Sequence, residues 1–112
     1  CTTFVQHDMD ARGLLDFQLG ETPFDPISKI TLSDKGYICA TGDRFVKNKL
    51  EIKCDIVDME AYALAKICKV YDIEFKCFKY ISDYANDESS NDWIENCNKG
   101  AEMFLSLYPN CK

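Results

Sequence analysis

The sequence predicts an α/β fold with parallel strands, and two observations indicate it. A short apolar run at residues 37–40 ends in a Thr-Gly-Asp turn, as a buried strand does. A helical segment at residues 57–68 is followed by a β-branched and aromatic run at residues 73–81. Strand, helix and strand in this order form a right-handed crossover unit with parallel strands.

Composition and charge set the outer limits of the prediction. With 112 residues, 46% of them hydrophobic, the chain is long enough for one globular domain or part of one. Its net charge of −6 and scattered lysines and arginines argue against binding to nucleic acid or an anionic membrane. No apolar segment reaches a membrane span and no signal peptide opens the chain, which predicts a cytoplasmic protein. The cysteine spacing fits neither a zinc knuckle nor a CxxC redox motif.

The N-terminal part is predicted to be a short strand followed by a long loop. Residues 1–5 have strand composition, whereas residues 6–26 contain two glycines and two prolines. Long loops of this kind often carry function. His7 is the only histidine, and because no nucleophile stands in an evident relation to it, it is interpreted as a loop residue rather than a catalytic one. Residues 31–36 are interpreted as a polar turn.

Phe45 and Val46 come directly after the turn that ends the strand at residues 37–40. Ligands of open α/β sheets bind at the carboxyl ends of the strands, so this turn delivers an aromatic ring and a backbone group to a candidate site. Ordinary core packing is the alternative for Phe45. A charged connector, residues 47–55, leads on to the helical segment.

The predicted helix carries a carboxylate on its apolar side. At about 100° per residue, its apolar stripe consists of Glu60, Ala63, Leu64 and Ile67, and its polar stripe of Tyr62, Lys66 and Lys69. An ionised Glu60 buried there costs on the order of several kcal/mol unless a partner compensates it. Glu60 is therefore a candidate binding residue. A carboxylate that caps its own helix, or a structural ion pair, is the alternative.

Asp83 follows the predicted strand at residues 73–81, at the same sheet edge as Phe45. Lys79, inside that strand, is either an edge charge or the partner of a buried acid. Trp93 opens the last helix and is interpreted either as a core residue or as the lid of a pocket.

The last helix is predicted to follow a polar loop at residues 84–91. Ser90 or Asn91 can cap its first turn, and Pro109 ends it.

Together, Glu60, Asp83 and Phe45 suit a flat heterocycle joined to a polyol. Cleavage of an N-ribosidic bond requires an acid that neutralises the departing base and a carboxylate that holds the ribose hydroxyls and shields the cationic sugar. It also requires an aromatic face for the heterocycle. The chain offers one candidate for each requirement.

Three motifs in this order resemble those of the purine nucleoside phosphorylase/nucleosidase superfamily. They are CATGDRFV at residues 39–46, VDMEA at residues 57–61 and YISD at residues 80–83. Within the superfamily, methylthioadenosine/S-adenosylhomocysteine nucleosidases are the most similar group. The resemblance implies a three-layer α/β fold with a mixed, mostly parallel sheet flanked by helices. Residues 1–112 would be the C-terminal part of its single domain, without the N-terminal half.

The resemblance implies a role for each of seven residues. Phe45 would stack on the adenine and the Val46 backbone would bind its edge. Met59 would lie under the ribose and Glu60 would bind its hydroxyl groups.

The remaining roles concern catalysis and the 5′ group. Asp83, with Ser82 beside it, would supply the proton at purine N7, and Trp93 would border the pocket for the 5′ substituent. The loop at residues 7–23 resembles a segment that reaches the neighbouring subunit in the family's dimers, which implies a homodimer of the complete protein. No cofactor and no metal are expected, and the expected partner is a small purine nucleoside.

The chain departs from the family pattern in two respects. Lys79 stands where an arginine is usual, and the half that carries the water-activating glutamate is absent. The predicted function is hydrolysis of the N-ribosyl bond of 5′-thio-substituted adenosines, with the isolated chain inactive. The alternatives are a phosphorolytic purine nucleoside phosphorylase and a non-catalytic nucleoside-binding fragment.

Overall fold

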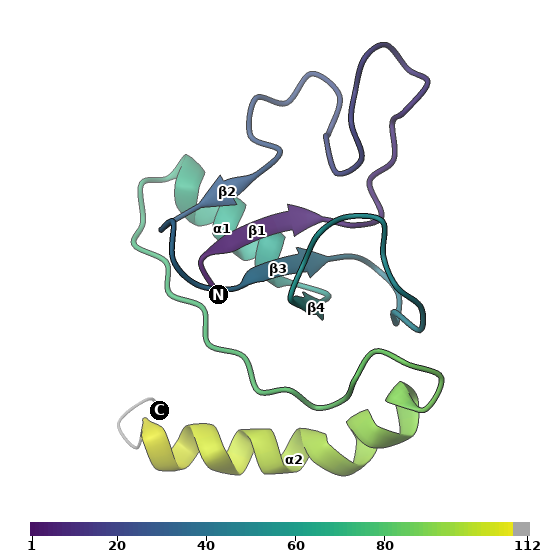
Figure 1. Ribbon diagram of the computed structural model, residues 1–112. Coiled ribbons are helices and arrows are strands. Elements are labelled where there is room, and N and C mark those ends of the chain that lie inside the picture. Colours follow the sequence, from purple (N-terminus) through teal and green to yellow (C-terminus); the bar gives the residue numbers. More distant parts are fainter. Residues whose placement is uncertain (109–112) are drawn as a thin grey trace. The chain divides into compact units, whose positions relative to one another are not determined.

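The computed structural model describes residues 1–108, which form two compact units. The sheet unit comprises residues 1–44 and 50–78; the helix unit comprises residues 45–49 and the chain from residue 79 onward. Figure 1 labels the elements of both units. In chain order they are β1 (Thr3–Gln6), β2 (Ile30–Thr31), β3 (Ile38–Thr41), β4 (Ile56–Asp58), α1 (Ala61–Val70) and α2 (Ser89–Leu107).

The four strands form one mixed, mostly parallel sheet in the order β2-β1-β3-β4. β1 pairs in parallel with β3, from Thr3 opposite Ile38 to Gln6 opposite Thr41, and β3 pairs in parallel with β4. β2 pairs with β1 in the antiparallel direction. The three parallel strands therefore end at the same edge of the sheet, after Gln6, Thr41 and Asp58. This confirms the predicted fold class.

Helix α1 packs across one face of the sheet and contacts β1, β2 and β3 (Figure 1). The core of the sheet unit consists of Phe4, Ile30, Cys39, Ala61, Tyr62 and Ala65. Phe4 is fully buried, and its ring meets the edge of the Phe75 ring with the centroids 5.5 Å apart. Full burial of one such side chain stabilises the fold by about 1.5–3 kcal/mol. The strand at the start of the chain is thus the centre of the core.

The prediction of which face of α1 is buried is wrong. Leu64, on the predicted apolar stripe, is 52% exposed, whereas Tyr62, on the polar stripe, is 5% exposed. The Tyr62 hydroxyl donates a hydrogen bond of 2.8 Å to the backbone oxygen of Ile27, and Lys66 forms an ion pair with Asp25. The long loop covers this stripe because its polar groups find partners there, which periodicity alone does not reveal.

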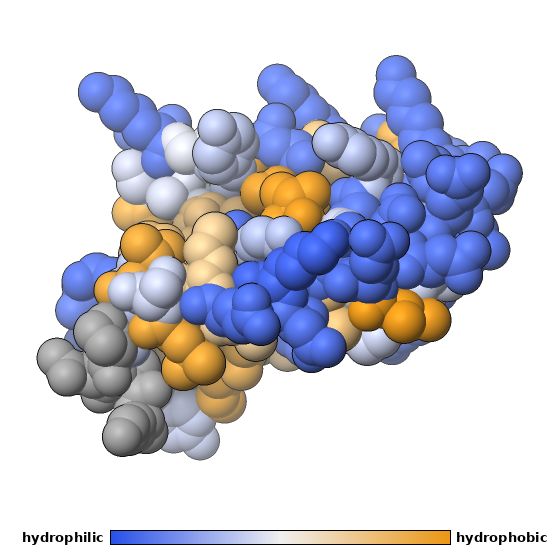
Figure 2. Space-filling view, turned by 90° about the horizontal axis from the view of Figure 1, so that it is seen from below, coloured by the Kyte–Doolittle hydropathy of each residue, from blue (hydrophilic) through white to orange (hydrophobic). Residues whose placement is uncertain are grey.

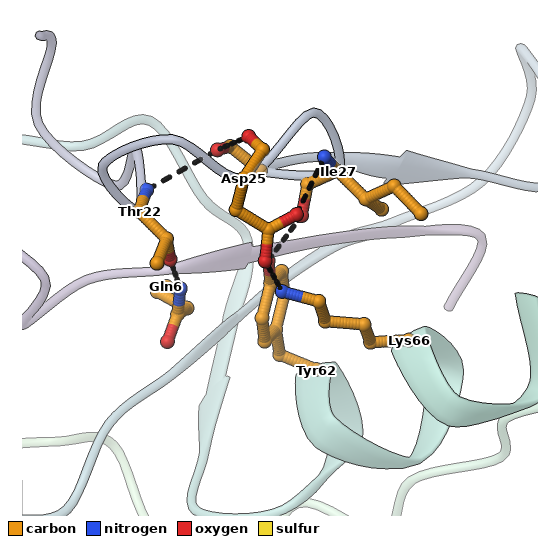
Figure 3. A network of polar contacts seen from close by, with 7 residues as sticks. Gln6, Thr22, Asp25, Ile27, Tyr62 and Lys66 are labelled. Atoms are coloured by element: carbon orange, nitrogen blue, oxygen red, sulfur yellow. Dashed lines mark hydrogen bonds and ion pairs between the residues drawn. The ribbon is translucent and has the colours of Figure 1, made fainter. Parts of the chain in front are cut away.

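The long loop predicted after β1 is observed at residues 7–29, and its second half is tied to the sheet and to α1. Figure 3 shows the contacts. Gln6 Nε2 donates to Thr22 Oγ1 at 2.9 Å, and the Asp25 carboxylate accepts from the backbone N–H of Ile27 at 2.8 Å and from Lys66. The Lys66 contact lowers the pKa of Asp25, and the same contact raises the pKa of Lys66. Both groups are therefore charged across the whole neutral range.

Two short strands and one missing strand correct the sequence predictions. β2 ends at Thr31, the first residue of the predicted polar turn, and β4 overlaps the predicted first turn of the helix. Residues 73–81, predicted to be a strand, form no β pairing within residues 1–108, so the predicted crossover unit with residues 37–40 is not formed. Phe75 and Cys77 still pack against the core at alternate positions. Strand composition is present, but a strand also requires the backbone of a neighbour.

Helix α2 begins two or three residues earlier than predicted. Glu88 occupies the N-cap position, where the sequence predicts Ser90 or Asn91. Ser89 is fully buried, and its hydroxyl accepts a hydrogen bond from a backbone N–H of the preceding turn. This contact favours an earlier start because it ties the loop to the first residue of the helix. The predicted end at Pro109 lies outside the described residues.

The segment before α2 packs along this helix. Asn96 Nδ2 donates to the backbone oxygen of Ser82 at 2.9 Å. Gly100 lies against Tyr80, where a Cβ atom would be 2.8 Å from the ring. The hydrogen bond and the close approach of Tyr80 to Gly100 hold the segment on the helix. A larger residue at position 100 would push the Tyr80 ring away.

Large apolar side chains of both units are exposed. On α2 they are Trp93, Ile94, Met103, Leu105 and Leu107. Figure 2 shows apolar side chains between hydrophilic ones on the surface seen from below. Such surfaces are typical of interfaces with another polypeptide. Neither helix formed by residues 1–108 combines the length and the apolar composition that a membrane crossing needs.

His7, directly after β1, is buried against the turn that follows β3. It is 5% exposed, and a Cβ atom on Gly42 would lie 2.3 Å from its Nε2 atom. Within the described part of the chain, neither ring nitrogen of His7 has a hydrogen-bond partner. Gly42 is therefore required here by the close approach of the imidazole ring.

We expect Gly42→Ala to lower the free energy of unfolding by about 1–3 kcal/mol, because the added methyl group overlaps the His7 ring. Urea unfolding of the chain measures this cost. In a His7→Ala background the overlap is removed, so Gly42→Ala should cost much less. An equal cost in both backgrounds would show that the ring is not what requires glycine.

The ion pair between Asp25 and Lys66 should stabilise the chain over a defined pH window. The lowered pKa of Asp25 contributes stability that is present above about pH 4 and is lost as the pH falls through that lowered pKa. The raised pKa of Lys66 contributes stability that is present below about pH 10 and is lost as the pH rises through it.

Lys66→Met should therefore lower the melting temperature by a constant amount between about pH 5 and 9, and by less below about pH 4. Lys69→Met, a change to an exposed lysine of the same helix, is the matched control and should lack this acid dependence. A difference between Lys66→Met and the native chain that persists unchanged at pH 3 would contradict the ion-pair assignment.

Candidate functional site

The ends of the parallel strands are joined to one another beyond the regular sheet. The backbone N–H of His7 donates to the oxygen of Thr41 at 3.0 Å, and that of Gly42 donates to the oxygen of Asp58 at 3.1 Å. The side chains are joined as well, since Thr41 Oγ1 donates to Asp58 Oδ1 at 2.5 Å. Hydrogen bonds therefore join the carboxyl ends of β1, β3 and β4 at this edge of the sheet.

The same two side chains hold the first turn of α1. Asp58 Oδ2 accepts from the backbone N–H of Ala61 at 2.8 Å, and Thr41 Oγ1 accepts from that of Tyr62 at 2.9 Å. The first amides of a helix have no acceptor inside the helix, so these contacts satisfy two of them. Neither residue is among the sequence-predicted site residues, although an aspartate just ahead of a helical segment is a capping signal that could have found Asp58.

Met59 and Glu60 form the link between β4 and α1. Met59 is 43% exposed, and Glu60 is exposed at the N-cap position with a φ of −138°. Its side chain makes no capping hydrogen bond. The predicted burial of Glu60 on an apolar helix face is therefore wrong, and so is the capping alternative. The reason is that the helix begins after Glu60, so its carboxylate belongs to the link rather than to a helix face.

Asp83 lies in the loop before α2, where its carboxylate is held by three donors. Ser82 Oγ donates to Oδ2 at 2.7 Å, and the backbone N–H of Ala85 donates to Oδ1 at 2.9 Å. Burial raises the pKa of Asp83, but the hydrogen bonds from Ser82, Ala85 and Ser89 outweigh it and hold the pKa below its usual value. The Asp83 carboxylate is therefore ionised at neutral pH in this chain.

Phe45 and Trp93 form an edge-to-face pair in the helix unit. Their ring centroids are 6.4 Å apart and their planes meet at 76°. Each side chain is 47% exposed, which does not fit the core-packing alternative for Phe45 or Trp93. The pair presents accessible aromatic surface, and the neighbouring Val46 is half-buried.

The seven predicted site residues are divided between the two units. The sheet unit holds Met59 and Glu60, and the helix unit holds Phe45, Val46, Ser82, Asp83 and Trp93. The structure brings residues together within each unit, as the pairs Ser82 with Asp83 and Phe45 with Trp93 show. The roles of all seven stay predictions.

Neither the cavity of the sheet unit nor, within residues 1–108, a group of metal ligands coincides with the seven predicted site residues. A cavity of about 340 Å³ in the sheet unit lies between the long loop and the connector near Ile52, and none of the seven residues lines it. Across residues 1–108, no three His, Cys, Asp or Glu side chains gather in an arrangement that could hold a metal ion.

The chain is similar in structure to two enzymes of Helicobacter pylori. Against futalosine hydrolase the TM-score is 0.80 at 26% identity, over 91% of this chain and 53% of that chain. Against 5′-methylthioadenosine/S-adenosylhomocysteine nucleosidase with butyl-thio-DADMe-Immucillin-A, the TM-score is 0.80 at 27% identity, over 91% and 53%. A putative nucleosidase of the latter kind from Francisella philomiragia shares the fold, with a TM-score of 0.73 at 21% identity, over 97% and 59%.

The chain thus spans little more than half the length of these solved structures. No curated protein matches it significantly. Residues 30–108, which include every candidate site residue, match the phosphorylase superfamily. The chain therefore belongs to the phosphorylase superfamily.

Proposed function

We propose that the chain is the C-terminal half of a purine nucleosidase that hydrolyses the N-ribosyl bond of 5′-thio-substituted adenosines. The observation that carries the proposal is the exposed carboxylate of Glu60, which stands at the carboxyl end of β4 beside the first turn of α1. Ligands of open α/β sheets bind at this end. Membership of the superfamily and similarity to two hydrolytic enzymes support the reaction class.

The ribose is assigned to the link between β4 and α1. A carboxylate accepts hydrogen bonds only, so Glu60 can hold the two hydroxyl groups of a ribose. Its charge also opposes the positive charge that develops on the sugar as the N-ribosyl bond breaks. Met59, at 43% exposure, offers an apolar contact beside that carboxylate.

The purine is assigned to the helix unit. Phe45 and Trp93 present aromatic surface that suits a flat ring and an apolar 5′ group, and Asp83 is the proposed proton donor to N7. In the chain Asp83 is ionised because three hydrogen bonds lower its pKa. Donation at neutral pH therefore requires that pKa to rise when the nucleoside buries the carboxyl group, since burial disfavours the charge.

A complementary half is part of the proposal. The chain exposes large apolar side chains on both helices, and residues 73–81 have strand composition without a partner strand among residues 1–108. A complementary half of the fold would cover these apolar side chains and supply a strand that pairs with residues 73–81. The exposed tip of the long loop, where Leu15 is 70% and Phe24 is 84% exposed, supports a homodimer of the complete protein.

A chimeric enzyme tests the proposed acid. The N-terminal half of the Helicobacter pylori nucleosidase, fused before this chain, should release adenine from methylthioadenosine without added phosphate, whereas the chain alone should not. Asp83→Asn in the chimera should lower kcat by about 10²–10⁴-fold with little loss of adenine affinity. Asp87→Asn, a change to an exposed residue of the same loop, is the matched control. Full activity with Asn at position 83, or hydrolysis by the chain alone, would contradict the assignment.

The choice of substrate is tested at Trp93. A methylthio group buried against the indole gains about 1–2 kcal/mol, whereas a charged 5′-phosphate would be stranded there. The chimera should therefore prefer methylthioadenosine to AMP, and Trp93→Ala should reduce that preference by about 5–30-fold. Ile94→Ala, beside it on α2 and 66% exposed, should leave the preference unchanged. Futalosine is the second substrate to assay, since the similarity to futalosine hydrolase is as high.

A further inference from the structure

We infer that Thr41 and Asp58 are positioning residues, which fix the link of Met59 and Glu60 and so hold the Glu60 carboxylate in the orientation that binds a sugar diol. This inference rests on the proposed function, because it concerns the ribose-binding part of the same site. It assigns roles to two residues that touch no substrate themselves. Their effect on binding is exerted through Glu60.

Asp58 fixes both ends of the link, one through its backbone and the other through its side chain. The Asp58 backbone lies opposite Thr41 in the pairing of β3 with β4, which fixes the chain before the link. Its side chain accepts from the N–H of Ala61 at 2.8 Å, which fixes the chain after the link. Only Met59 and Glu60 lie between these two points, so the Asp58 contacts limit the backbone conformations open to both residues.

Thr41 supports this arrangement with both functions of its hydroxyl group. Oγ1 donates to Asp58 Oδ1 at 2.5 Å and accepts from the N–H of Tyr62 at 2.9 Å. A hydroxyl group can donate and accept at once, whereas an isosteric methyl group can do neither. Ser at position 41 retains both contacts, and Val retains only the shape. The pair Thr41→Ser and Thr41→Val therefore separates hydrogen bonding from packing.

The orientation of Glu60 depends on this backbone support because its side chain has no capping contact of its own. A carboxylate that accepts from two neighbouring hydroxyl groups must lie within about 0.5 Å of its productive position. The rest of α1 is held independently, by the hydrogen bond of the Tyr62 hydroxyl to the Ile27 oxygen and by the core. Loss of the Thr41 hydroxyl should thus disturb the link more than the fold.

Kinetics of the chimeric enzyme test the inference with two substrates, methylthioadenosine and its analogue without the 3′-hydroxyl group. Thr41→Val should lower kcat/KM about 10–100-fold for methylthioadenosine and less than about threefold for the analogue. Thr41→Ser should retain the native values for both. In a Glu60→Gln background, Thr41→Val should have no further effect on either substrate.

Equal losses for the two substrates would overturn the inference, because a purely structural role does not distinguish them. A further loss in the Glu60→Gln background would overturn it as well. The proposed function fails in a different way: Glu60→Gln would then leave the preference for the 3′-hydroxyl group unchanged in an active chimera.

Amide hydrogen exchange on the chain alone provides a second test that needs no catalysis. Thr41→Val removes the acceptor of the Tyr62 N–H, so exchange at Tyr62 should accelerate about tenfold or more, with Thr41→Ser close to native. Exchange at Ala61 should accelerate as well, because Asp58 loses the donor that orients it. Unchanged exchange at both amides in Thr41→Val would overturn the inference.

Discussion

The hydrogen bond between Thr41 and Asp58 is the contact on which the junction of the sheet with the first turn of α1 depends. It joins the end of β3 to the end of β4, and each partner also accepts a hydrogen bond from the first turn of α1. The strand ends and the start of the helix are therefore joined at this point, two residues before the exposed Glu60. The apolar core holds α1 on the sheet, but these polar contacts decide where the helix begins.

The sequence predicts the elements with strong local signals. The apolar run of β3 and the existence of the last helix, α2, are identified correctly, as is the mostly parallel sheet. What it does not predict depends on partners distant in the chain. Tyr62 is buried because Ile27 accepts its hydroxyl hydrogen, and residues 73–81 are not a strand because no strand within residues 1–108 pairs with them. Neither partner is visible in periodicity or composition.

The sequence indicates which residue types make up the candidate site, but not their burial or their hydrogen-bond partners. Glu60 is exposed where the pattern indicates burial, since the helix starts one residue later than this carboxylate. Asp83 is held in the ionised form by Ser82 and two further donors, which a motif cannot show. Glu60 is thus exposed without a capping contact, whereas Asp83 is half-buried and hydrogen-bonded.

Methyl NMR of the chimera tests the central claim most directly, because the chain contains only three methionines. With the chain labelled at the methionine methyl groups, a titration with methylthioadenosine should shift the signal of Met59 saturably, and the signal of Met103 should stay in place. Glu60→Gln should weaken that titration. A Met59 signal that does not respond while adenine is released would show that the nucleoside binds elsewhere and would contradict the account.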